Sequence, residues 1–534
     1  TGSSNTLIGG LAGDALTTGL YNVAVGKGAL STEDAHGLNV AVGYNALNTL
    51  NAGADAYNVA VGSNAGTAMT TGVRNTILGG NAADGLTTGS YNIAVGSFAI
   101  GTDDLGSYTT AVGYNSLSAQ NYATATDSYN TAVGARAGEA VTTGLSNTLV
   151  GGLAGDALTD ADQNIAIGYA ALSADTLGSR SVAIGANTLI VQNFTTATNT
   201  YNTAVGANAG SSVTTGVENT LIGGLAGDAI TTGNNNVAVG HGSLGTNILS
   251  DHNVAIGNDA LGTHNQATSI DSYNVGVGSG AGFAVTTGTY NTLVGSYAGN
   301  ALTTGVENTF VGYVAGDALI DADYSVAMGS YALTADTYGS RSVAIGRSTL
   351  QAQNFTTATD AYNVGVGYAA GAAITTGIHN TLIGGLTGDL LTDADYNVAV
   401  GTSALSADTY GSRATALGHS ALEAQNFTTA TNSYNTAVGN NAGKAITTGI
   451  YNTIVGGSAG DALTDADSNV AVGVSALSTD TYGSKSTAIG TSALATQNFT
   501  TATDSYNVAV GFDAGTAVTI GKNNTFVGGL AGDA

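Results

Sequence analysis

The chain has 534 residues, of which 80 are glycine and only 9% are charged, and it contains no proline, cysteine or tryptophan. The formal net charge of −26 is spread along the chain, which argues against binding to nucleic acid or to an anionic membrane surface, since both need clustered Lys and Arg. No apolar run approaches the roughly 18 residues of a membrane span, and no signal-peptide pattern opens the chain.

One short motif, Asn-x-Ala-Val/Ile-Gly, recurs thirty times between Asn5 and Gly528. Its fifth residue is always glycine, which predicts a backbone corner that side chains would obstruct or that needs positive φ. Its first residue is usually asparagine, which predicts a ladder of side-chain amides bonded from one copy to the next. The six copies without asparagine begin at Thr109, Ser181, Ser325, Ser342, Ala414 and Ser486.

Three copies of 17 residues and one of 21 make a 72-residue higher repeat; one extra 17-residue copy lies between Asn274 and Asn363, and the copy at Asn39 is 19 residues long. One such repeat has its motifs at Asn130, Asn147, Asn164 and Ser181, and the next begins at Asn202. This period, with β-branched runs, Gly punctuation and no helical pattern, predicts an all-β parallel β-solenoid. We expect about thirty coils of 17 to 21 residues, each with two short strands, in one continuous array over residues 1–534. Because the chain starts and stops inside a repeat, we expect it to be a fragment of a longer chain.

Both faces of the motif strand are predicted to be apolar. Val59 and Val61 point to one face and Ala60 to the other, because side chains alternate along a strand. A solitary solenoid would show polar residues on its outer face. We therefore expect one face to fill the coil and the other to meet a neighbouring chain, which predicts a homo-oligomer.

Residues 181–185 and 342–346 (Ser-Val-Ala-Ile-Gly) and residues 253–257 (Asn-Val-Ala-Ile-Gly) resemble the head repeat of YadA-like trimeric autotransporter adhesins. The pattern at 129–134, Tyr-Asn-Thr-Ala-Val-Gly, also resembles repeats of bacteriophage tail fibres. The resemblance covers essentially the whole chain. It implies a homotrimer of left-handed parallel β-rolls, intertwined or side by side, that forms a fibre and carries adhesive surface. The longer period, and the lack of a coiled-coil stalk, membrane barrel or knob, are departures from the family pattern.

The second coil of the 72-residue repeat often carries Asp-Ala-Asp, and the next coil then ends in a base. One coil plus one position separates the second aspartate from this base, so we predict cross-coil salt bridges that fix which coil stacks on which. Exposed pairs of this kind stabilise by only about 0 to 1 kcal/mol each. The predicted pairs are Asp162 with Arg180, Asp323 with Arg341, Asp395 with Arg413 and Asp467 with Lys485.

The same acidic pairs are alternative candidates for calcium. Calcium takes about six or more oxygen ligands, so a single Asp-x-Asp beside a base makes a poor site, and we predict no metal and no other cofactor. The calcium candidates are Asp160, Asp162, Asp321, Asp323, Asp393, Asp395, Asp465 and Asp467.

The fourth coil contains Gln-Asn-Phe-Thr-Thr-Ala-Thr and the four extra residues, which predicts a loop that bulges once per four coils. These loops are candidate surfaces for lateral contact or for a ligand; the alternative is that the phenylalanine anchors a longer turn. The tyrosine that often precedes the motif, as in Tyr129 and Tyr201, either packs on its surroundings or binds a sugar with its ring face. The loop phenylalanines are Phe194, Phe355, Phe427 and Phe499.

Residue patterns for catalysis are lacking: the sequence shows no nucleophile with a base and no metal-binding spacing among its six histidines, so we predict that the chain is not an enzyme. We expect an extracellular structural fibre, on a cell surface or virion, that acts as the shaft or head of an attachment fibre. Its expected partners are itself and a cell-surface glycan or protein receptor. One alternative is a self-polymerising matrix or appendage filament. A minor alternative is ice binding by the threonine row Thr142, Thr159 and Thr176, which Asn193 interrupts.

Overall fold

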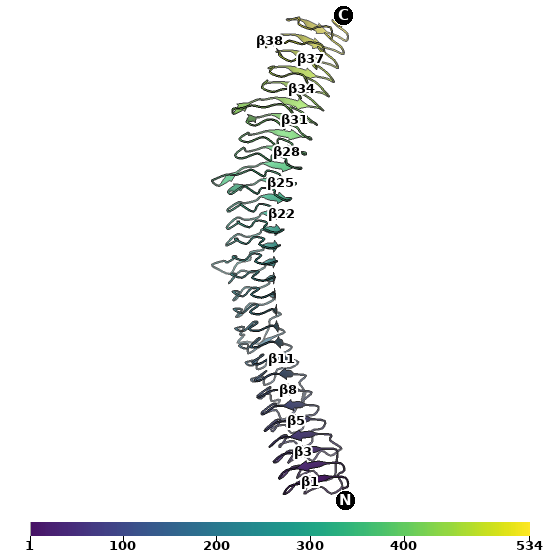
Figure 1. Ribbon diagram of the computed structural model, residues 1–534, viewed down its shortest axis with the longest axis vertical. Helices are drawn as coiled ribbons and strands as arrows, with labels where there is room; N and C mark the ends of the chain where they lie inside the picture. The colour runs from purple at the N-terminus through teal and green to yellow at the C-terminus, as the bar shows by residue number, and fades with distance from the viewer. Residues whose placement is uncertain (1) are drawn as a thin grey trace. The chain divides into compact units, whose positions relative to one another are not determined.

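The computed structural model describes residues 2–534, which form strands and turns but no helix. The chain divides into two units, Thr1–Ser272 and Tyr273–Ala534. Each unit is a parallel β-solenoid in which every coil contributes one three-residue strand, and Figure 1 shows these strands following one another along each unit. The prediction of an all-β parallel β-solenoid is confirmed. The single array over 1–534 and the left-handed coil stay predictions.

Strands of successive coils pair in parallel and in register, so that Thr131 lies beside Thr148 and Ala132 beside Leu149. The coil strands of the first unit are β1 (Thr6–Ile8), β2 (Val23–Val25), β3 (Val40–Val42), β4 (Val59–Val61), β5 (Thr76–Leu78), β6 (Ile93–Val95), β8 (Thr110–Val112), β10 (Thr131–Val133), β11 (Thr148–Val150), β12 (Ile165–Ile167), β14 (Val182–Ile184), β16 (Thr203–Val205), β17 (Thr220–Ile222), β18 (Val237–Val239) and β19 (Val254–Ile256).

The second unit repeats the arrangement. Its coil strands are β20 (Val275–Val277), β21 (Thr292–Val294), β22 (Thr309–Val311), β23 (Val326–Met328), β25 (Val343–Ile345), β27 (Val364–Val366), β28 (Thr381–Ile383), β29 (Val398–Val400), β31 (Thr415–Leu417), β33 (Thr436–Val438), β34 (Thr453–Val455), β35 (Val470–Val472), β37 (Thr487–Ile489), β39 (Val508–Val510) and β40 (Thr525–Val527).

Within residues 2–534, a second strand occurs only where a long coil meets the coil before it, so the prediction of two strands in every coil is wrong. Elsewhere the chain is turned by residues in the left-handed region, such as Ser146 with a φ of 58° and Arg180 with a φ of 63° at the ends of their coils. Such turns leave no extended segment to pair. The extra two-stranded sheets are β7 (Gly106–Ser107) with β9 (Thr126–Asp127), β13 (Gly178–Ser179) with β15 (Thr198–Asn199), β24 (Gly339–Ser340) with β26 (Thr359–Asp360), β30 (Gly411–Ser412) with β32 (Thr431–Asn432), and β36 (Gly483–Ser484) with β38 (Thr503–Asp504).

The motif glycine forms a corner for two reasons, and the sequence prediction named both. Gly312 has a φ of +140°, a conformation that side-chain-bearing residues rarely adopt. A Cβ on Gly312 would also lie 2.7 Å from both the carbonyl carbon and the oxygen of Gly329 in the next coil. Stacked corners therefore need glycine in every coil.

The motif asparagine forms the predicted ladder, with an additional role. Asn130 Oδ1 accepts a hydrogen bond from the backbone N–H of Asn147 in the next coil at 2.9 Å, and its Nδ2 donates to the carbonyl of Gly144 in its own coil at 2.8 Å. Amide-to-amide bonds also occur, as from Asn308 Nδ2 to Asn291 Oδ1 at 3.0 Å. The side chain thus closes one coil and fastens the next.

The interior is a thin column of small and branched apolar side chains. The middle residue of each coil strand points inward, and Ala60, Ala132, Leu149 and Phe310 are all 0% exposed. The sequence predicted that one face of the strand fills the coil without saying which; the structure puts the Ala face inside, and the flanking Val and Thr residues face outward.

Candidate functional site

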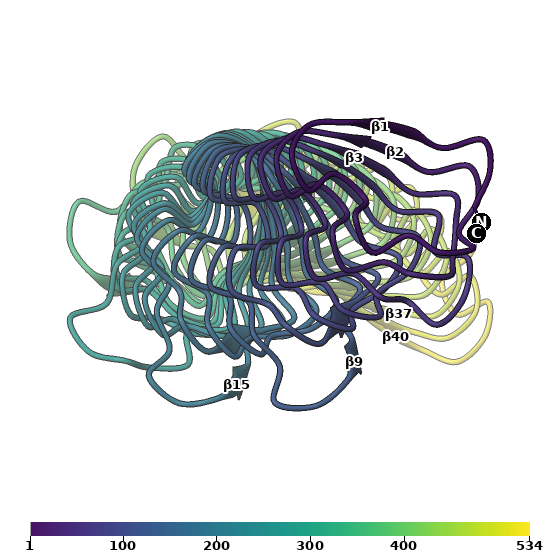
Figure 2. The ribbon, with the colours of Figure 1, turned by 90° about the horizontal axis from the view of Figure 1, so that it is seen from below.

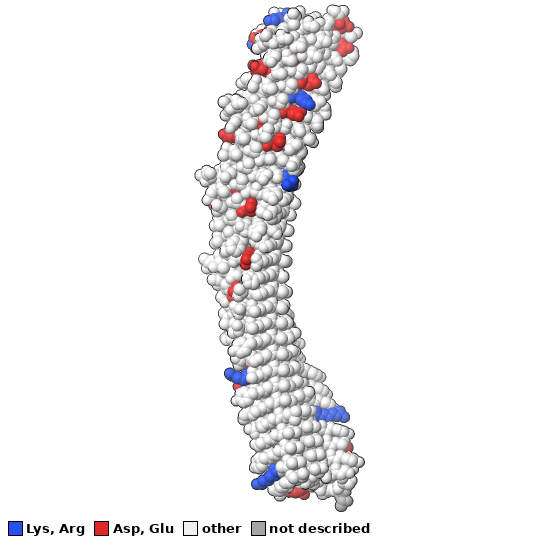
Figure 3. Space-filling view, in the orientation of Figure 1, with Lys and Arg blue, Asp and Glu red and all other residues white. Residues whose placement is uncertain are grey.

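The outer strand face of each unit is formed by the first and third residues of every coil strand, and it is the broadest candidate for a contact surface. These residues are Thr, Val, Ile, Leu or Met in all copies of the motif, so the face carries no charge. Its larger side chains remain partly open to solvent; Val133 is 37% and Ile222 39% exposed. Figure 3 shows how few charged residues interrupt the visible surface.

The four predicted salt bridges do not form among residues 2–534, so that prediction is wrong. The pairs that do not form are Asp162 with Arg180, Asp323 with Arg341, Asp395 with Arg413 and Asp467 with Lys485. The backbones are adjacent as the spacing predicted, since the N–H of Arg180 donates to the carbonyl of Asp162 at 3.0 Å.

The side chains of these pairs point in opposite directions along the stack. Asp162 reaches back, where its Oδ1 accepts the backbone N–H of Leu145 at 2.8 Å. Arg341 reaches forward to Asp360 at 2.8 Å, and Lys485 to Asp504 at 2.6 Å. Arg180 donates both forward to Tyr201 and back to Gln163 at 3.0 Å, and Arg413 reaches forward to Asn432.

The Asp-Ala-Asp pairs fasten the preceding coil rather than forming an open carboxylate cluster. Asp160 Oδ1 accepts the hydroxyl of Thr143 at 2.6 Å, in addition to the Asp162 bond above. The same bonds recur in the other copies, between Asp323 and Val306, Asp393 and Thr376, Asp395 and Ile378, Asp465 and Thr448, Asp467 and Ile450, and Asp321 and Thr304. One oxygen of each carboxylate, Oδ1, is therefore used by the preceding coil.

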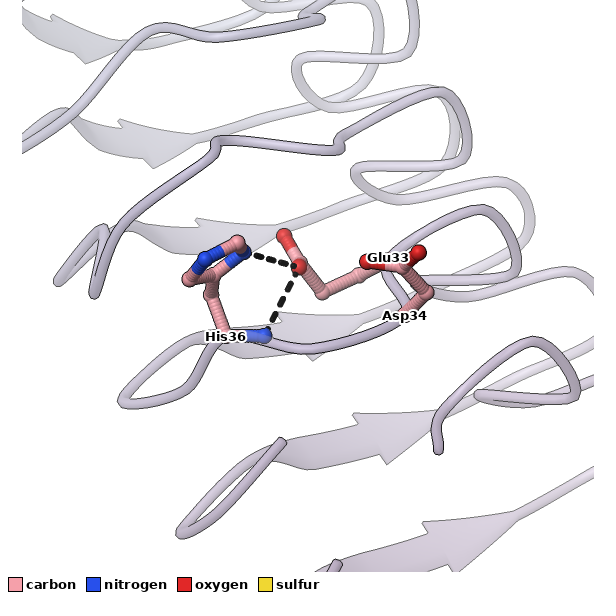
Figure 4. Close-up of side chains that lie close together, drawn as sticks. All are labelled: Glu33, Asp34 and His36. Atoms are coloured by element: carbon pink, nitrogen blue, oxygen red, sulfur yellow. Dashed lines mark hydrogen bonds and ion pairs between the residues drawn. The ribbon is translucent and has the colours of Figure 1, made fainter. Parts of the chain in front are cut away.

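Within residues 2–534, one group of side chains brings three possible metal ligands close together: Glu33, Asp34 and His36, drawn in Figure 4. None of the calcium candidates predicted from the sequence belongs to this group. Glu33 is buried, and its Oε1 accepts the backbone N–H of His36 at 3.1 Å and lies 3.3 Å from the ring Nδ1. Its Oε2 accepts the N–H of Ala52 at 3.3 Å. This carboxylate thus holds its own turn and the next coil.

The insertion loops bulge as predicted, but their phenylalanines do not form the contact surface. Phe194 is only 6% exposed, and its backbone N–H donates to Asp175 Oδ1 at 3.2 Å. Phe355, Phe427 and Phe499 are buried in the same way. The anchor interpretation is therefore confirmed. What the loop exposes is Thr195, Thr196 and Ala197, and Figure 2 shows the loops before β9 and β15 extending beyond the coils.

The residue that precedes the motif forms stacked ladders of side chains. In the second unit, Tyr362 and His379 lie 5.3 Å apart and His379 and Tyr396 5.0 Å apart, both nearly parallel. Arg413 continues the stack, 4.9 Å above the Tyr396 ring. Because the rings cover one another's faces, a sugar cannot stack on them inside a ladder. Packing is thus the better interpretation of these tyrosines.

The threonine row behind the ice-binding alternative is used within the stack. The hydroxyl of Thr142 donates to the carbonyl of Thr159 at 3.3 Å, and the hydroxyl of Thr159 to the carbonyl of Thr176 at 3.0 Å. The donors run along the solenoid instead of facing outward, so this row gives no support to ice binding.

Sequence reasoning missed a buried polar network at the twelfth residue of the coils. Asp175 Oδ2 accepts from Gln192 Nε2 in the next coil at 2.6 Å, and both side chains are fully buried. The signal was available, because Asp and then Gln recur in a row that is otherwise apolar, as at Leu158. The five pairs are Asp103 with Gln120, Asp175 with Gln192, Asp336 with Gln353, Asp408 with Gln425 and Asp480 with Gln497.

Desolvation governs the titration of several carboxyl groups. Burial raises the pKa of Asp103 and Asp175 above the usual value, although hydrogen bonds from Gln120 and Gln192 oppose the effect. Burial also raises the pKa of a row of carboxyls at the tenth residue of the coils: Asp84, Asp156, Asp228, Asp317, Asp389 and Asp461.

These raised pKa values predict a protein that gains stability on mild acidification. Between the ordinary Asp pKa and the raised one, the folded state binds more protons than the unfolded state, so the free energy of unfolding falls as pH rises through that window. The net charge of −26 acts in the same direction. Thermal melts at fixed ionic strength should show a midpoint that rises as the pH is lowered toward this window. A midpoint that decreases steadily from pH 8 to pH 5 would contradict the prediction.

Residues 2–534 contain no helix long and apolar enough to cross a membrane. No protein-family model matches the chain, and no curated protein matches it either. Its function is therefore argued from the geometry of the coils.

Proposed function

We propose that the chain is a non-enzymatic extracellular structural fibre, acting as the shaft or head of an attachment fibre, in which three copies associate through their outer strand faces. The observation that carries the proposal is the uncharged outer strand face, whose larger side chains, such as Val133, Ile222 and Ile345, are 37–39% exposed. Monomeric proteins rarely leave so extended an apolar surface open to water.

A second copy of the chain is the occupant that fits this face. Two sheets pack about 10 Å apart when their side-chain rows interdigitate, and rows spaced by one coil match only a partner with the same repeat. Each copy carries a net charge of −26, so copies repel one another except where both surfaces are uncharged. The outer strand face is such a surface in every coil.

The resemblance to adhesin heads and phage tail fibres supports the attachment role, together with a cell-surface glycan or protein receptor as partner. Exposed Thr195, Thr196 and Ala197 and their counterparts in the other insertion loops are the surface that this receptor would meet. The buried Asp175 carboxylate accepts hydrogen bonds from Gln192 and from the backbone of Phe194, which gives it a structural role within the stack.

Charge placed on the outer strand face should separate the copies. Light scattering should give the mass of three chains for the unaltered protein and of one chain for Val133→Glu/Ile222→Glu. The matched control, Ala135→Glu/Ala207→Glu, adds the same charge just beyond the glycine corner, outside the strand face, and should keep the three-chain mass. A single-chain mass for the unaltered protein would overturn the proposal. Open-ended filaments in negative-stain images would favour the self-polymerising alternative.

A further inference from the structure

The buried polar network repeats with nearly the same geometry in each of its copies. In the second unit, Asp336 Oδ2 accepts from Gln353 Nε2 at 2.5 Å, and Asp336 Oδ1 accepts the backbone N–H groups of Gly339 at 3.0 Å and of Phe355 at 3.1 Å. Gln353 Nε2 also donates to Ser342 Oγ at 3.0 Å. The carboxylate is thus satisfied without a cation.

Each network spans three consecutive coils. Asp336 lies in the first coil, Gln353 and Ser342 lie in the second, and Gln353 Oε1 accepts Asn363 Nδ2 of the third at 2.9 Å. The side chains of all four residues are 0% exposed. Water therefore cannot replace a partner that is lost.

Coils outside the network carry little information about which neighbour they stack on, because they are almost interchangeable. In most of them the twelfth residue is apolar and fully buried, as at Leu319 and Ile374 on either side of the network. Consecutive coils share the same strand register, glycine corner and asparagine ladder. A chain of such coils can slip by one coil during folding and keep most of its contacts.

Slippage across the network would be costly. If the coil that begins at Ser342 were looped out, Asp336 would face Ile374 and lose Gln353, which leaves a buried carboxylate with too few donors. An apolar pair at the same place would tolerate the slip. In another copy of the network, Ala414 occupies the place of Ser342, and Gln425 Nε2 still donates to Asp408 Oδ2 at 2.6 Å. The Asp–Gln hydrogen bond is therefore the constant part of the network.

We infer that the Asp–Gln pair is a register lock that fixes which coil stacks on which, once in each 72-residue repeat. The sequence analysis expected surface salt bridges to fix the stacking of the coils; we assign that role to the buried Asp–Gln pair instead. Two sites use other residues at these positions, Asn247 with His264 and Glu33 with Leu50, so the lock differs along the chain.

Cysteine cross-linking tests the lock, since the chain has no cysteine of its own. Ser330→Cys with Arg347→Cys reports the native register, because these residues occupy matching places in adjacent coils. Ser330→Cys with Tyr368→Cys reports the slipped register. In the native stack that pair is two coils apart, about 10 Å, which is beyond the Cα separation that a disulfide spans.

The lock predicts that Asp336→Leu/Gln353→Leu raises the yield of the slipped cross-link at least tenfold after dilute refolding, with the monomer mass confirmed on a denaturing gel. Leu319→Ala, which loosens the same core but keeps the network, should leave the yield unchanged. An unchanged yield in the double variant, or an equal rise with Leu319→Ala, would overturn the inference.

A second copy of the network keeps the test decisive if the first double variant does not fold, as judged by loss of the native cross-link. Asp408→Leu/Gln425→Leu should behave in the same way with Thr402→Cys/Asn440→Cys as the slipped reporter. Failure of the slipped cross-link to rise in this copy would sink the inference. Neither result depends on whether copies of the chain associate, so the lock and the proposed fibre are judged separately.

Discussion

Alanine at Gly384 is expected to disrupt the second unit, whereas alanine at the next residue, Gly385, should be tolerated. Gly384 has a φ of +138°, and a Cβ there would lie 2.7 Å from the carbonyl carbon and oxygen of Gly401 and from Thr387 Oγ1. Left-handed strain of this type costs about 1 to 3 kcal/mol, and the clash with a backbone that cannot move without opening the stack adds to it. We expect a total loss of roughly 3 to 5 kcal/mol in local stability.

Gly385 is the matched control, since a Cβ there meets nothing within 4 Å. Gly385→Ala should leave stability unchanged or raise it by up to about 1 kcal/mol through the unfolded chain. Hydrogen exchange of the amides around β28 and β29 is the suitable measurement, because solenoids unfold coil by coil and a single melting midpoint averages over many coils. Equal protection in the two variants would contradict the corner model.

The fold was predictable because it depends on a period. The recurrence of glycine and asparagine fixed the coil length, and the alternation in Val59-Ala60-Val61 indicated two apolar faces without indicating which of them fills the interior. What the motif did not contain was the path between strands. That path depends on residues in the left-handed region, such as Ser146 and Arg180, and their residue types do not predict this conformation. For this reason the sequence analysis wrongly expected a second strand in every coil.

The site predictions failed where the direction of a side chain mattered. The spacing of one coil plus one position correctly placed the backbone of Arg180 beside that of Asp162, but the left-handed φ of Arg180 accompanies a side chain that reaches Tyr201 in the next coil. Phe194 belongs to an insertion loop, yet its ring fills the space under that loop instead of forming a surface. Spacing gives proximity, and only the backbone conformation gives orientation.

The buried network was missed for a different reason. In a sequence so rich in Gly, Thr and Asp, single polar residues look like surface residues, and Asp175 and Gln192 lie outside the conspicuous motif. Their periodicity is visible only when coils are aligned by the glycine corner, which places both residues in a row otherwise filled by Val141, Leu158 and their counterparts. A polar residue that recurs in an apolar row is the signal to look for.

Replacing Gln192 by leucine is expected to destabilise the first unit more than replacing both members of the pair. Gln192→Leu removes the donor to Asp175 Oδ2 and the acceptor of Asn202 Nδ2, which are 2.6 Å and 2.8 Å from the glutamine amide atoms. A buried charged group left without its partner costs about 3 to 5 kcal/mol. In Asp175→Leu/Gln192→Leu the carboxylate is gone and the row becomes apolar like its neighbours, so most of that cost should disappear.

The pH dependence of this pair of variants separates a buried charge from a simple packing defect. Burial already raises the pKa of Asp175, and loss of the Gln192 hydrogen bond, which lowers it, must raise it further. The folded state of Gln192→Leu then gains a proton on mild acidification, so its stability deficit should shrink between pH 8 and pH 5. The double variant has no such carboxyl and should keep a constant difference from the unaltered protein. Hydrogen exchange around β12 and β14 measures both differences. A deficit of Gln192→Leu that is independent of pH would mean that the glutamine fills space rather than holding a charge.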